Sequence, residues 1–216
     1  MSFRGILFDF DGTLFDTWPG LVAAYQTTHK HYFGRAWQPL PARNVLLMPR
    51  RSALHNMMGH TPTPEQEQFF VNAYQATMLD NSPAFPGALE TLAWLNDIGL
   101  PWGIASNKPY EHVAKFIEHT PLLNTAHCVV CANETLRRKP HPDILRHASN
   151  QLGLTTSDLL YVGDHEHDLD AANTCGMACA FVHYGYMADR SQLDQYDIAV
   201  HIYQSCLELC DFIKPS

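Results

Sequence analysis

Five short apolar runs, separated by segments of helical periodicity, constrain the fold of this chain more than any other feature. The apolar runs are Gly5–Phe10, Trp102–Ser106, Cys128–Cys131, Leu159–Gly163 and Cys179–His183. The helical segments between them are Ala88–Ile98, Tyr110–Glu118, Pro142–Gly153 and Leu169–Cys175. Strands that alternate with helices form a parallel sheet with helices on both faces. The pattern predicts an α/β fold with a doubly wound, Rossmann-like core.

The interval between the first two apolar runs is too long for one crossover helix. It holds three helical stretches, separated by prolines: Leu21–Phe33, Arg51–Met58 and Pro64–Met78. We therefore predict two domains, a catalytic α/β core (residues 1–16 and 86–216) and an inserted helical cap (residues 17–85). A chain of 216 residues is long enough for such a core with an insertion.

Composition narrows the class of partner. The net charge of −8, without a basic block, argues against nucleic acid and against acidic membranes. No apolar window reaches the length of a membrane-spanning helix, and we expect no signal peptide because the first apolar run is too short for one. The six cysteines are typical of reduced thiols, and Cys128 and Cys131 lie in a strand-like run. We expect a cytoplasmic protein with a small-molecule substrate.

Two carboxylates follow the first apolar run, in Asp9-Phe10-Asp11-Gly12-Thr13. Residues i and i+2 of a strand point to the same side, so Asp9 and Asp11 are expected to face together. The carboxyl end of a strand in an open parallel sheet is also where ligands bind. Two close carboxylates repel each other, which favours a metal, a shared proton or a nucleophile at this position. The alternative is a solvated Asp-Gly turn after an edge strand.

Polar residues recur where the other strands end. Ser106, Asn107, Lys139, Asp164 and Asp168 all lie at or just after predicted strand ends. Because parallel strands end at one edge of the sheet, we expect these groups to converge on Asp9 and Asp11. Taken singly, each has a structural alternative, such as a helix cap at Ser106 or a first-turn helix acid at Asp168. Taken together, these residues favour a functional site at the edge of the sheet.

This set of groups is suited to phosphoryl transfer. Asp9 can attack phosphorus and form an aspartyl-phosphate, while Asp11 serves as the general acid and then as the base. Asp164 and a carboxylate oxygen of Asp9 suit Mg²⁺, a hard ion that prefers oxygen ligands. Ser106 and nearby backbone N–H groups, together with Lys139, can hold phosphoryl oxygens.

The order of these residues resembles the four motifs of the haloacid dehalogenase superfamily. The motifs are Asp9-Phe10-Asp11-Gly12-Thr13, Ser106, Lys139-Pro140, and Gly163-Asp164 with Asp168 four residues later. Within that superfamily the chain is similar to the phosphoglycolate phosphatases, in Ser106-Asn107-Lys108-Pro109, Lys139-Pro140-His141-Pro142-Asp143 and Tyr184-Gly185-Tyr186. Bacterial N-acetylmuramic acid 6-phosphate phosphatases share much of this pattern.

The resemblance implies that Asp9 is the nucleophile and Asp11 the acid/base. It implies Mg²⁺ bound by the Asp9 side chain, the Asp11 main-chain carbonyl and Asp164, with Asp168 in support. We further predict that Gly12, Thr13 and Asn107 bind substrate. The resemblance also implies a cap that closes over the site and supplies selectivity. True dehalogenases lack the second carboxylate, so Asp11 favours phosphate-ester chemistry.

Two features depart from the family pattern. His165 stands where relatives usually have Ser or Thr, and with His167 it could accept a softer transition metal; the alternative is two surface histidines on a loop. In the cap, Arg50 and Arg51 follow Pro49 and could pair with a substrate carboxylate. The alternative there is a solvated pair at a helix start.

We predict a Mg²⁺-dependent phosphomonoesterase that acts on a small phosphorylated metabolite, with 2-phosphoglycolate as the first candidate. A sugar phosphate, such as N-acetylmuramic acid 6-phosphate, is the second. A phosphosugar mutase is a rival on the same fold, and a non-catalytic binding protein on this scaffold is a rival from another class. The intact set of Asp9, Asp11, Ser106, Lys139 and Asp164 argues against the binding protein.

Overall fold

The computed structural model describes residues 3–37, 48–133, 135–187, 191 and 193–213. The chain divides into two compact units, one formed by Met1–Phe15 with Ala84–Ser216 and the other by Asp16–Pro83. These bounds lie one or two residues from those that we predicted for the core and the insertion. The unit that contains the sheet is called the core unit here, and Asp16–Pro83 is called the helical unit.

The core unit is built on a six-stranded, all-parallel sheet in the order β3-β2-β1-β4-β5-β6. The strands are β1 (Gly5–Phe8), β2 (Trp102–Ser106), β3 (Cys128–Cys131), β4 (Leu159–Gly163), β5 (Ala178–Val182) and β6 (Ile198–Ile202). The doubly wound α/β core predicted from the sequence is thereby confirmed, and so are five of its strands. The sixth, β6, was missed because it is a half-exposed strand at the sheet edge, whereas the other strands are mostly buried.

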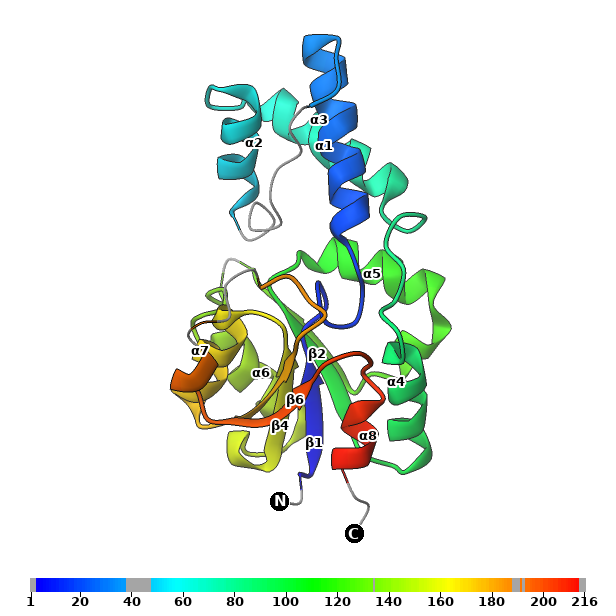
Figure 1. The fold of residues 1–216 in the computed structure, drawn as a ribbon, viewed down its shortest axis with the longest axis vertical. Helices are drawn as coiled ribbons and strands as arrows, with labels where there is room; N and C mark the ends of the chain where they lie inside the picture. Colours follow the sequence, from blue (N-terminus) through cyan, green and yellow to red (C-terminus); the bar gives the residue numbers. More distant parts are fainter. Residues whose placement is uncertain (1–2, 38–47, 134, 188–190, 192, 214–216) are drawn as a thin grey trace. The chain divides into compact units, whose positions relative to one another are not determined.

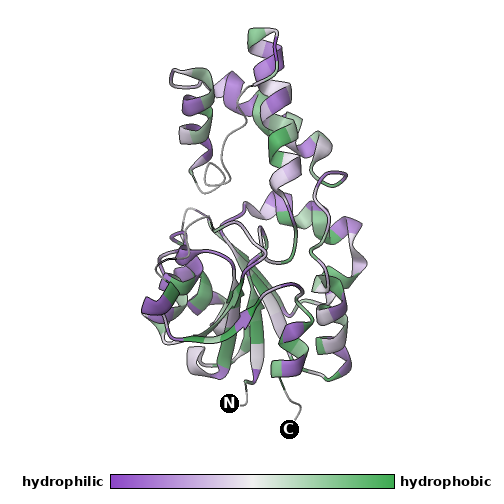
Figure 2. Cartoon of the chain, in the orientation of Figure 1, coloured by the Kyte–Doolittle hydropathy of each residue, from purple (hydrophilic) through white to green (hydrophobic). Residues whose placement is uncertain are grey.

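Helices cover both faces of this sheet (Figure 1). One face carries α6 (Asp143–Leu152) and α7 (Glu166–Cys175), which pack on Leu7 and Tyr161 in one buried apolar cluster. The other face carries α4 (Ala88–Asp97), α5 (Tyr110–His119) and the short α8 (Glu208–Phe212). Successive residues of a strand point to opposite faces, which is why both layers find apolar partners. The strands are correspondingly mostly hydrophobic, whereas the helices combine hydrophobic and hydrophilic residues (Figure 2).

Local sequence signals set the ends of these elements. Both α6 and α7 end at a glycine with positive φ, Gly153 at 66° and Gly176 at 70°, a conformation that glycine adopts without steric cost. Helix α7 begins at Glu166, three residues before the predicted Leu169, because His165 caps it. The described part of the core unit also contains the 3₁₀ turns η2 (Pro121–Thr125), η3 (Thr156–Asp158) and η4 (Leu193–Gln195).

The helical unit contains the three helices that the sequence predicts. They are α1 (Trp18–Phe33), α2 (Arg50–Met58) and α3 (Pro64–Thr77). Helix α1 packs along α3, with the rings of Tyr25 and Phe70 4.6 Å apart. A reciprocal capping box between Thr63 and Gln66 starts α3, which satisfies two backbone donors that a helix start otherwise leaves unpaired.

Candidate active site

The polar groups gather where β1 ends. Strand β1 pairs with β2 on one side and with β4 on the other, so the chain winds away from it in both directions. Ligands of doubly wound proteins bind at such a switch point, beyond the carboxyl ends of the strands. Asp9 is the first residue after β1, and its N–H donates to the Val162 carbonyl of β4 at 2.9 Å. The ladder therefore fixes the Asp9 backbone, while its side chain, 12% exposed, faces the site.

The ammonium of Lys139 lies at the centre of the site and contacts several of its residues. Its Nζ donates to Asp168 Oδ1 at 2.6 Å and to the Tyr161 hydroxyl at 2.6 Å, and it lies 2.9 Å from Asp9 Oδ1. The Tyr161 hydroxyl in turn donates to the Ala105 carbonyl at 2.8 Å. The two hydrogen bonds and the ion pair with Asp9 together fix the position of the ammonium. Lys139 is thus held between Asp9 and Asp168.

Asn107 holds the loop that carries Lys139. Its Oδ1 accepts from the Lys139 N–H at 2.8 Å, and its Nδ2 donates to the Lys139 carbonyl at 3.0 Å. Arg138 donates to the Asn107 carbonyl at 2.7 Å. The end of β2 is thereby tied to the loop before α6. The side chain of Asn107 supports the site from within the protein, and a contact with substrate remains a prediction.

Asp164 sits in a cradle made by two backbone segments. Its Oδ2 accepts from the Tyr186 N–H at 2.6 Å, and its Oδ1 accepts from the Thr13 hydroxyl at 3.3 Å. A Cβ on Gly12 would lie 2.3 Å from the carboxylate, and one on Gly185 would lie 2.2 Å from the Asp164 Cβ. Gly12 also has a φ of +84°. Only glycine permits this close approach of backbone to carboxylate.

Asp168, at the start of α7, binds both the end of β4 and Lys139 through hydrogen bonds. Its Oδ2 accepts from the backbone N–H groups of Asp164 at 3.1 Å and His165 at 3.0 Å, while Oδ1 binds Lys139. A Cβ on Gly163 would lie 2.5 Å from Asp168, so the end of β4 packs directly on this side chain. Both oxygens of Asp168 are therefore occupied by donors of the chain itself.

The three buried carboxylates differ in their affinity for protons. Burial, together with the charges of Asp168 and Asp11, raises the pKa of Asp9 to about 6, although Lys139 opposes the rise. Burial and the charges of Asp168 and Asp9 hold the pKa of Asp164 well above its ordinary value. The pKa of Asp168 is lowered, because its charge and hydrogen bond with Lys139 outweigh burial. One ammonium thus lies among three carboxylates and contacts two of them, so the cluster has more carboxylates than cations.

Asp11 has a different partner. Lys108 Nζ lies 2.8 Å from Asp11 Oδ1, and Lys108 itself is 6% exposed. The ammonium lies 5.9 Å from the ring centres of Phe10 and Phe116, within reach of a cation–π interaction. Ser106 is buried at the end of β2, and its Oγ accepts from the Lys108 N–H at 3.3 Å. The β2 end therefore orients both Ser106 and the cation that pairs with Asp11.

The predicted site residues fall into three groups. Asp9, Asp164 and Asp168 lie together, with ligand oxygens within 4.8 Å of one another, and Lys139 contacts two of them. Asp11 and Ser106 are joined through Lys108. Arg50 and Arg51 lie in the helical unit, where they face Glu67 at 3.8 Å and 3.6 Å.

Sequence reasoning missed the structural roles of Lys108, Tyr161, Gly185 and Tyr186. Signals for some of them were present, since Lys108 and the Tyr184-Gly185-Tyr186 segment both belong to patterns shared with phosphoglycolate phosphatases. Tyr161 gave no signal, because one aromatic residue in a buried strand is ordinarily core. The role of its hydroxyl follows from its tertiary contacts with Lys139 and the Ala105 carbonyl.

The carboxylate cluster fits a hard divalent cation. Its donors are all oxygen atoms, which is the set that Mg²⁺ prefers. Asp9 Oδ1 is buried and makes no hydrogen bond of good geometry within the described part of the chain; its close neighbour is the Lys139 charge. A cation beside Asp9 and Asp164 would also supply the missing positive charge.

A buried carboxylate beside a fixed lysine and an acidic cluster, at the switch point of a doubly wound sheet, suits phosphoryl transfer. The chain belongs to the haloacid dehalogenase-like hydrolase family, whose family model matches residues 6–182. It is an enzyme of the phosphoric monoester hydrolase class, as the phosphatase relatives below also indicate.

The chain is similar to two kinds of characterised phosphatase. It is 32% identical over 197 residues to the N-acetylmuramic acid 6-phosphate phosphatase of Pseudomonas aeruginosa, covering 87% of this chain and 84% of that protein. It is 30% identical over 231 residues to the phosphoglycolate phosphatase of Escherichia coli O157:H7, covering 95% and 90%. Non-catalytic binding is therefore not its function.

Solved structures share the fold. A protein of Haemophilus somnus 129pt, described as a predicted phosphoglycolate phosphatase, matches with a TM-score of 0.82 and 21% identity over 99% of each chain. A putative haloacid dehalogenase-like hydrolase of Bacteroides fragilis matches with a TM-score of 0.81 and 22% identity over 96% and 100%. Among the described residues, no helix is both long and apolar enough to cross a membrane.

Proposed function

We propose that this phosphatase hydrolyses a small organic phosphomonoester through a phosphorylated Asp9, with 2-phosphoglycolate as the leading substrate. The observation that carries the mechanism is the position of Asp9. Its carboxylate is buried 2.9 Å from the fixed ammonium of Lys139, within the Asp9–Asp164–Asp168 cluster. A carboxylate held in this way meets an incoming phosphoryl group at a defined angle, which is a large part of catalysis.

In the first step an oxygen of Asp9 attacks phosphorus and the ester oxygen leaves. Asp11 delivers a proton to that oxygen, so that an alcohol departs rather than an alkoxide. The ammonium of Lys139 and the backbone N–H groups beside Ser106 stabilise the charge on the phosphoryl oxygens. Asp168 does not touch substrate in this scheme, because its oxygens are engaged in positioning Lys139 and the start of α7.

In the second step water attacks the phosphorus of the aspartyl-phosphate. Asp11, now ionised, takes the proton from that water, Asp9 is released as a carboxylate, and inorganic phosphate leaves. The residues that would hold Mg²⁺ are Asp9, the Asp11 main-chain carbonyl and Asp164. When bound, the ion offsets the charge of the phosphate and the carboxylates.

Substrate choice is assigned to the helical unit. The core unit recognises phosphate, metal and water, which all phosphate esters share. Arg50 and Arg51 at the start of α2 are the candidates for binding a substrate carboxylate by two parallel hydrogen bonds. In the structure both face Glu67, at 3.8 Å and 3.6 Å, and they are 47% and 65% exposed. Such long, exposed pairs are weak, so a substrate carboxylate can replace them.

A sugar phosphate remains the second candidate, because the N-acetylmuramic acid 6-phosphate phosphatase is as similar to the chain as the phosphoglycolate phosphatases are. The deciding experiment compares kcat/KM for 2-phosphoglycolate, N-acetylmuramic acid 6-phosphate and an aryl phosphate, with Mg²⁺ present. A preference of at least about tenfold for the sugar phosphate would reverse the ranking. Conversion of one phosphosugar isomer into another, without release of phosphate, would indicate the mutase instead. We place this reaction in the cytoplasm, where small phosphorylated metabolites are found.

A further inference from the structure

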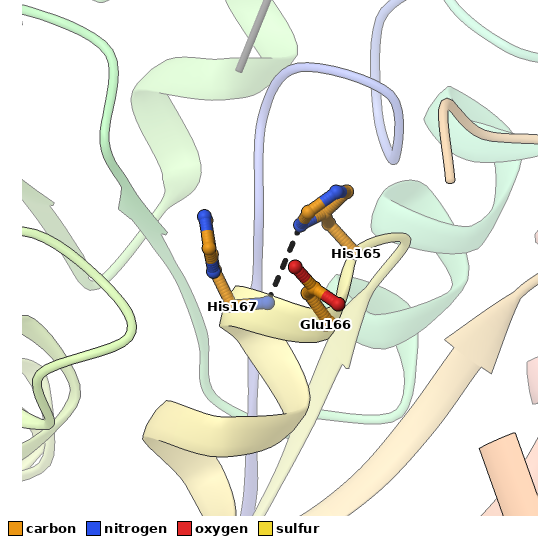
Figure 3. A group of neighbouring side chains, drawn as sticks. All are labelled: His165, Glu166 and His167. Atoms are coloured by element: carbon orange, nitrogen blue, oxygen red, sulfur yellow. Dashed lines mark hydrogen bonds between the residues drawn. The ribbon is translucent and has the colours of Figure 1, made fainter. Parts of the chain in front are cut away.

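The first turn of α7 carries a second group of metal-binding side chains, which the phosphatase mechanism does not use. His165, Glu166 and His167 each offer one ligand atom, and these three atoms lie within 4.8 Å of one another. Figure 3 shows all three side chains projecting from the same end of α7. Glu166 is exposed and the two histidines are half-buried, so an ion from solvent can reach the group.

The chemistry of this group differs from that of the carboxylate cluster. Two imidazoles and one carboxylate form a nitrogen-rich set, whereas Asp9, Asp164 and Asp168 offer oxygen alone. Imidazole favours late first-row ions such as Zn²⁺, Ni²⁺ and Co²⁺, and Mg²⁺ avoids it. Two histidines, one glutamate and a water also form a common tetrahedral zinc shell. The two groups should therefore bind different ions from the same solution.

The geometry needs only a small adjustment. A tetrahedral ion with bonds of about 2.1 Å places its ligand atoms roughly 3.4 Å apart. The rings of His165 and His167 have their centroids 4.8 Å apart, with planes at 63°. The three ligand atoms lie within 4.8 Å of one another, so binding would draw the exposed Glu166 and the two rings closer together.

Two hydrogen-bonding facts favour an occupant. The Nδ1 atom of His167 is buried and has no hydrogen-bond partner within the described part of the chain. A buried polar atom left unpaired in this way is commonly explained by an ion or a water. The cap contact of the neighbouring ring is also weak, since the His167 N–H donates to His165 Nδ1 at 3.3 Å. His165 therefore loses only a weak hydrogen bond when its Nδ1 carries the proton and its Nε2 binds a metal.

We propose that His165, Glu166 and His167 form an accessory site for a late first-row divalent cation of the Zn²⁺, Ni²⁺ and Co²⁺ class, separate from the Asp9–Asp164–Asp168 cluster. The site stands on the geometry of α7 alone. It does not depend on which phosphate ester the enzyme hydrolyses.

The test is a Co²⁺ titration of the full chain, without a polyhistidine tag and with Mg²⁺ in large excess to fill the carboxylate cluster. Visible absorption of Co²⁺ reports nitrogen ligands, and calorimetry with Ni²⁺ gives the stoichiometry. We expect one ion per chain. His167→Gln and Glu166→Gln should each weaken binding at least about tenfold. His165→Ser should do the same while keeping a side chain that caps helices well.

The matched control is the other histidine pair of the core unit, in which His183 Nε2 and His201 Nδ1 lie 2.9 Å apart. His201→Gln should leave binding unchanged. The proposal is overturned if His201→Gln removes the signal while His165→Ser and His167→Gln retain it, or if the wild type takes up no Co²⁺. Loss of the signal in Asp164→Asn alone would place the ion in the carboxylate cluster. Binding is measured without substrate, so failure of the proposed phosphatase mechanism would leave this result unaffected.

Discussion

The ammonium of Lys108 lies 2.8 Å from Asp11 Oδ1, although the two residues are 97 positions apart in the chain. Lys108 is buried beside two phenylalanine rings, whereas the Asp11 side chain is 30% exposed. The ion pair therefore restrains the Asp11 carboxylate while leaving part of it accessible. Such restraint would give Asp11 a fixed direction in the two proton transfers that we propose for it.

Asp11→Asn should damage alkyl esters more than aryl esters. A poor leaving group needs the proton that Asp11 delivers, which is worth roughly 10²- to 10⁴-fold in rate, and an aryl oxide needs it much less. Lys108→Met should show the same dependence on the leaving group, with a smaller loss of rate. Asp11 is still present in this variant but no longer pairs with an ammonium. The measurement is the single-turnover rate of the phosphorylation step for one alkyl and one aryl phosphate. Equal losses for the two esters would contradict the assignment.

Asp9→Asn should lower turnover by at least about three orders of magnitude, since the amide cannot attack phosphorus. Asp143→Asn is the matched control, because it makes the same change at the start of α6, where Asp143 pairs with Arg137 at 2.8 Å. Phosphate release measures activity, and circular dichroism confirms that both variants fold. Near-normal turnover in Asp9→Asn would remove Asp9 from the nucleophile's role.

The same Asp9 variant should gain stability in a pH-dependent manner. Burial raises the pKa of Asp9 from 3.8 to about 6, so the folded state binds the proton more tightly than the unfolded state. The stability that this provides is complete below about pH 4 and is lost as the pH rises through about 6. Without metal at pH 7.5, Asp9→Asn should therefore unfold with a higher free energy, by up to about 3 kcal/mol. Urea denaturation with a chelator at pH 7.5 and at pH 4 would measure this, and a pH-independent difference would count against it.

Mg²⁺ should be required for activity and should stabilise the folded protein. Exhaustive chelation should abolish turnover, and Ca²⁺ should inhibit because its looser coordination misplaces the nucleophile. A saturating excess of Mg²⁺, at about 100 times its Kd, should raise the free energy of unfolding by about 2.7 kcal/mol. Asp164→Asn should remove most of that increase. Full activity in the chelated enzyme would disprove the requirement.

Arg50→Ala and Arg51→Ala should lower the preference for a carboxylated substrate. Loss of one charge-assisted contact costs roughly 1.5–3 kcal/mol, which is about tenfold to a hundredfold in kcat/KM for 2-phosphoglycolate. An aryl phosphate should lose almost nothing. Glu67→Gln is the control, since it frees both arginines and should not reduce the preference. If neither arginine variant changes the ratio of the two substrates, these residues form a solvated surface pair.

The sequence was enough to predict the fold class and to place polar residues at the strand ends. Apolar runs that alternate with helices predict a parallel sheet because each strand must be buried on both faces. Asp9, Ser106 and Asp164 stand at the ends of such runs, and strand ends of a parallel sheet share one edge. Edge strand β6 and the short helix α8 escaped prediction, since half-exposed elements of five residues carry too little pattern.

Only the tertiary structure decided which of these groups touch. It joined Lys139 to Asp168, Asp9 and Tyr161, and it paired Asp11 with Lys108 rather than with Asp9. It also brought the Tyr186 N–H onto Asp164, from a segment 22 positions away. Strand order, loop path and side-chain direction set these contacts, and none of the three is a local property of the sequence. For this reason the sequence identified the types of residue at the site. The charges that surround each carboxylate, and therefore its pKa, depend on the tertiary structure.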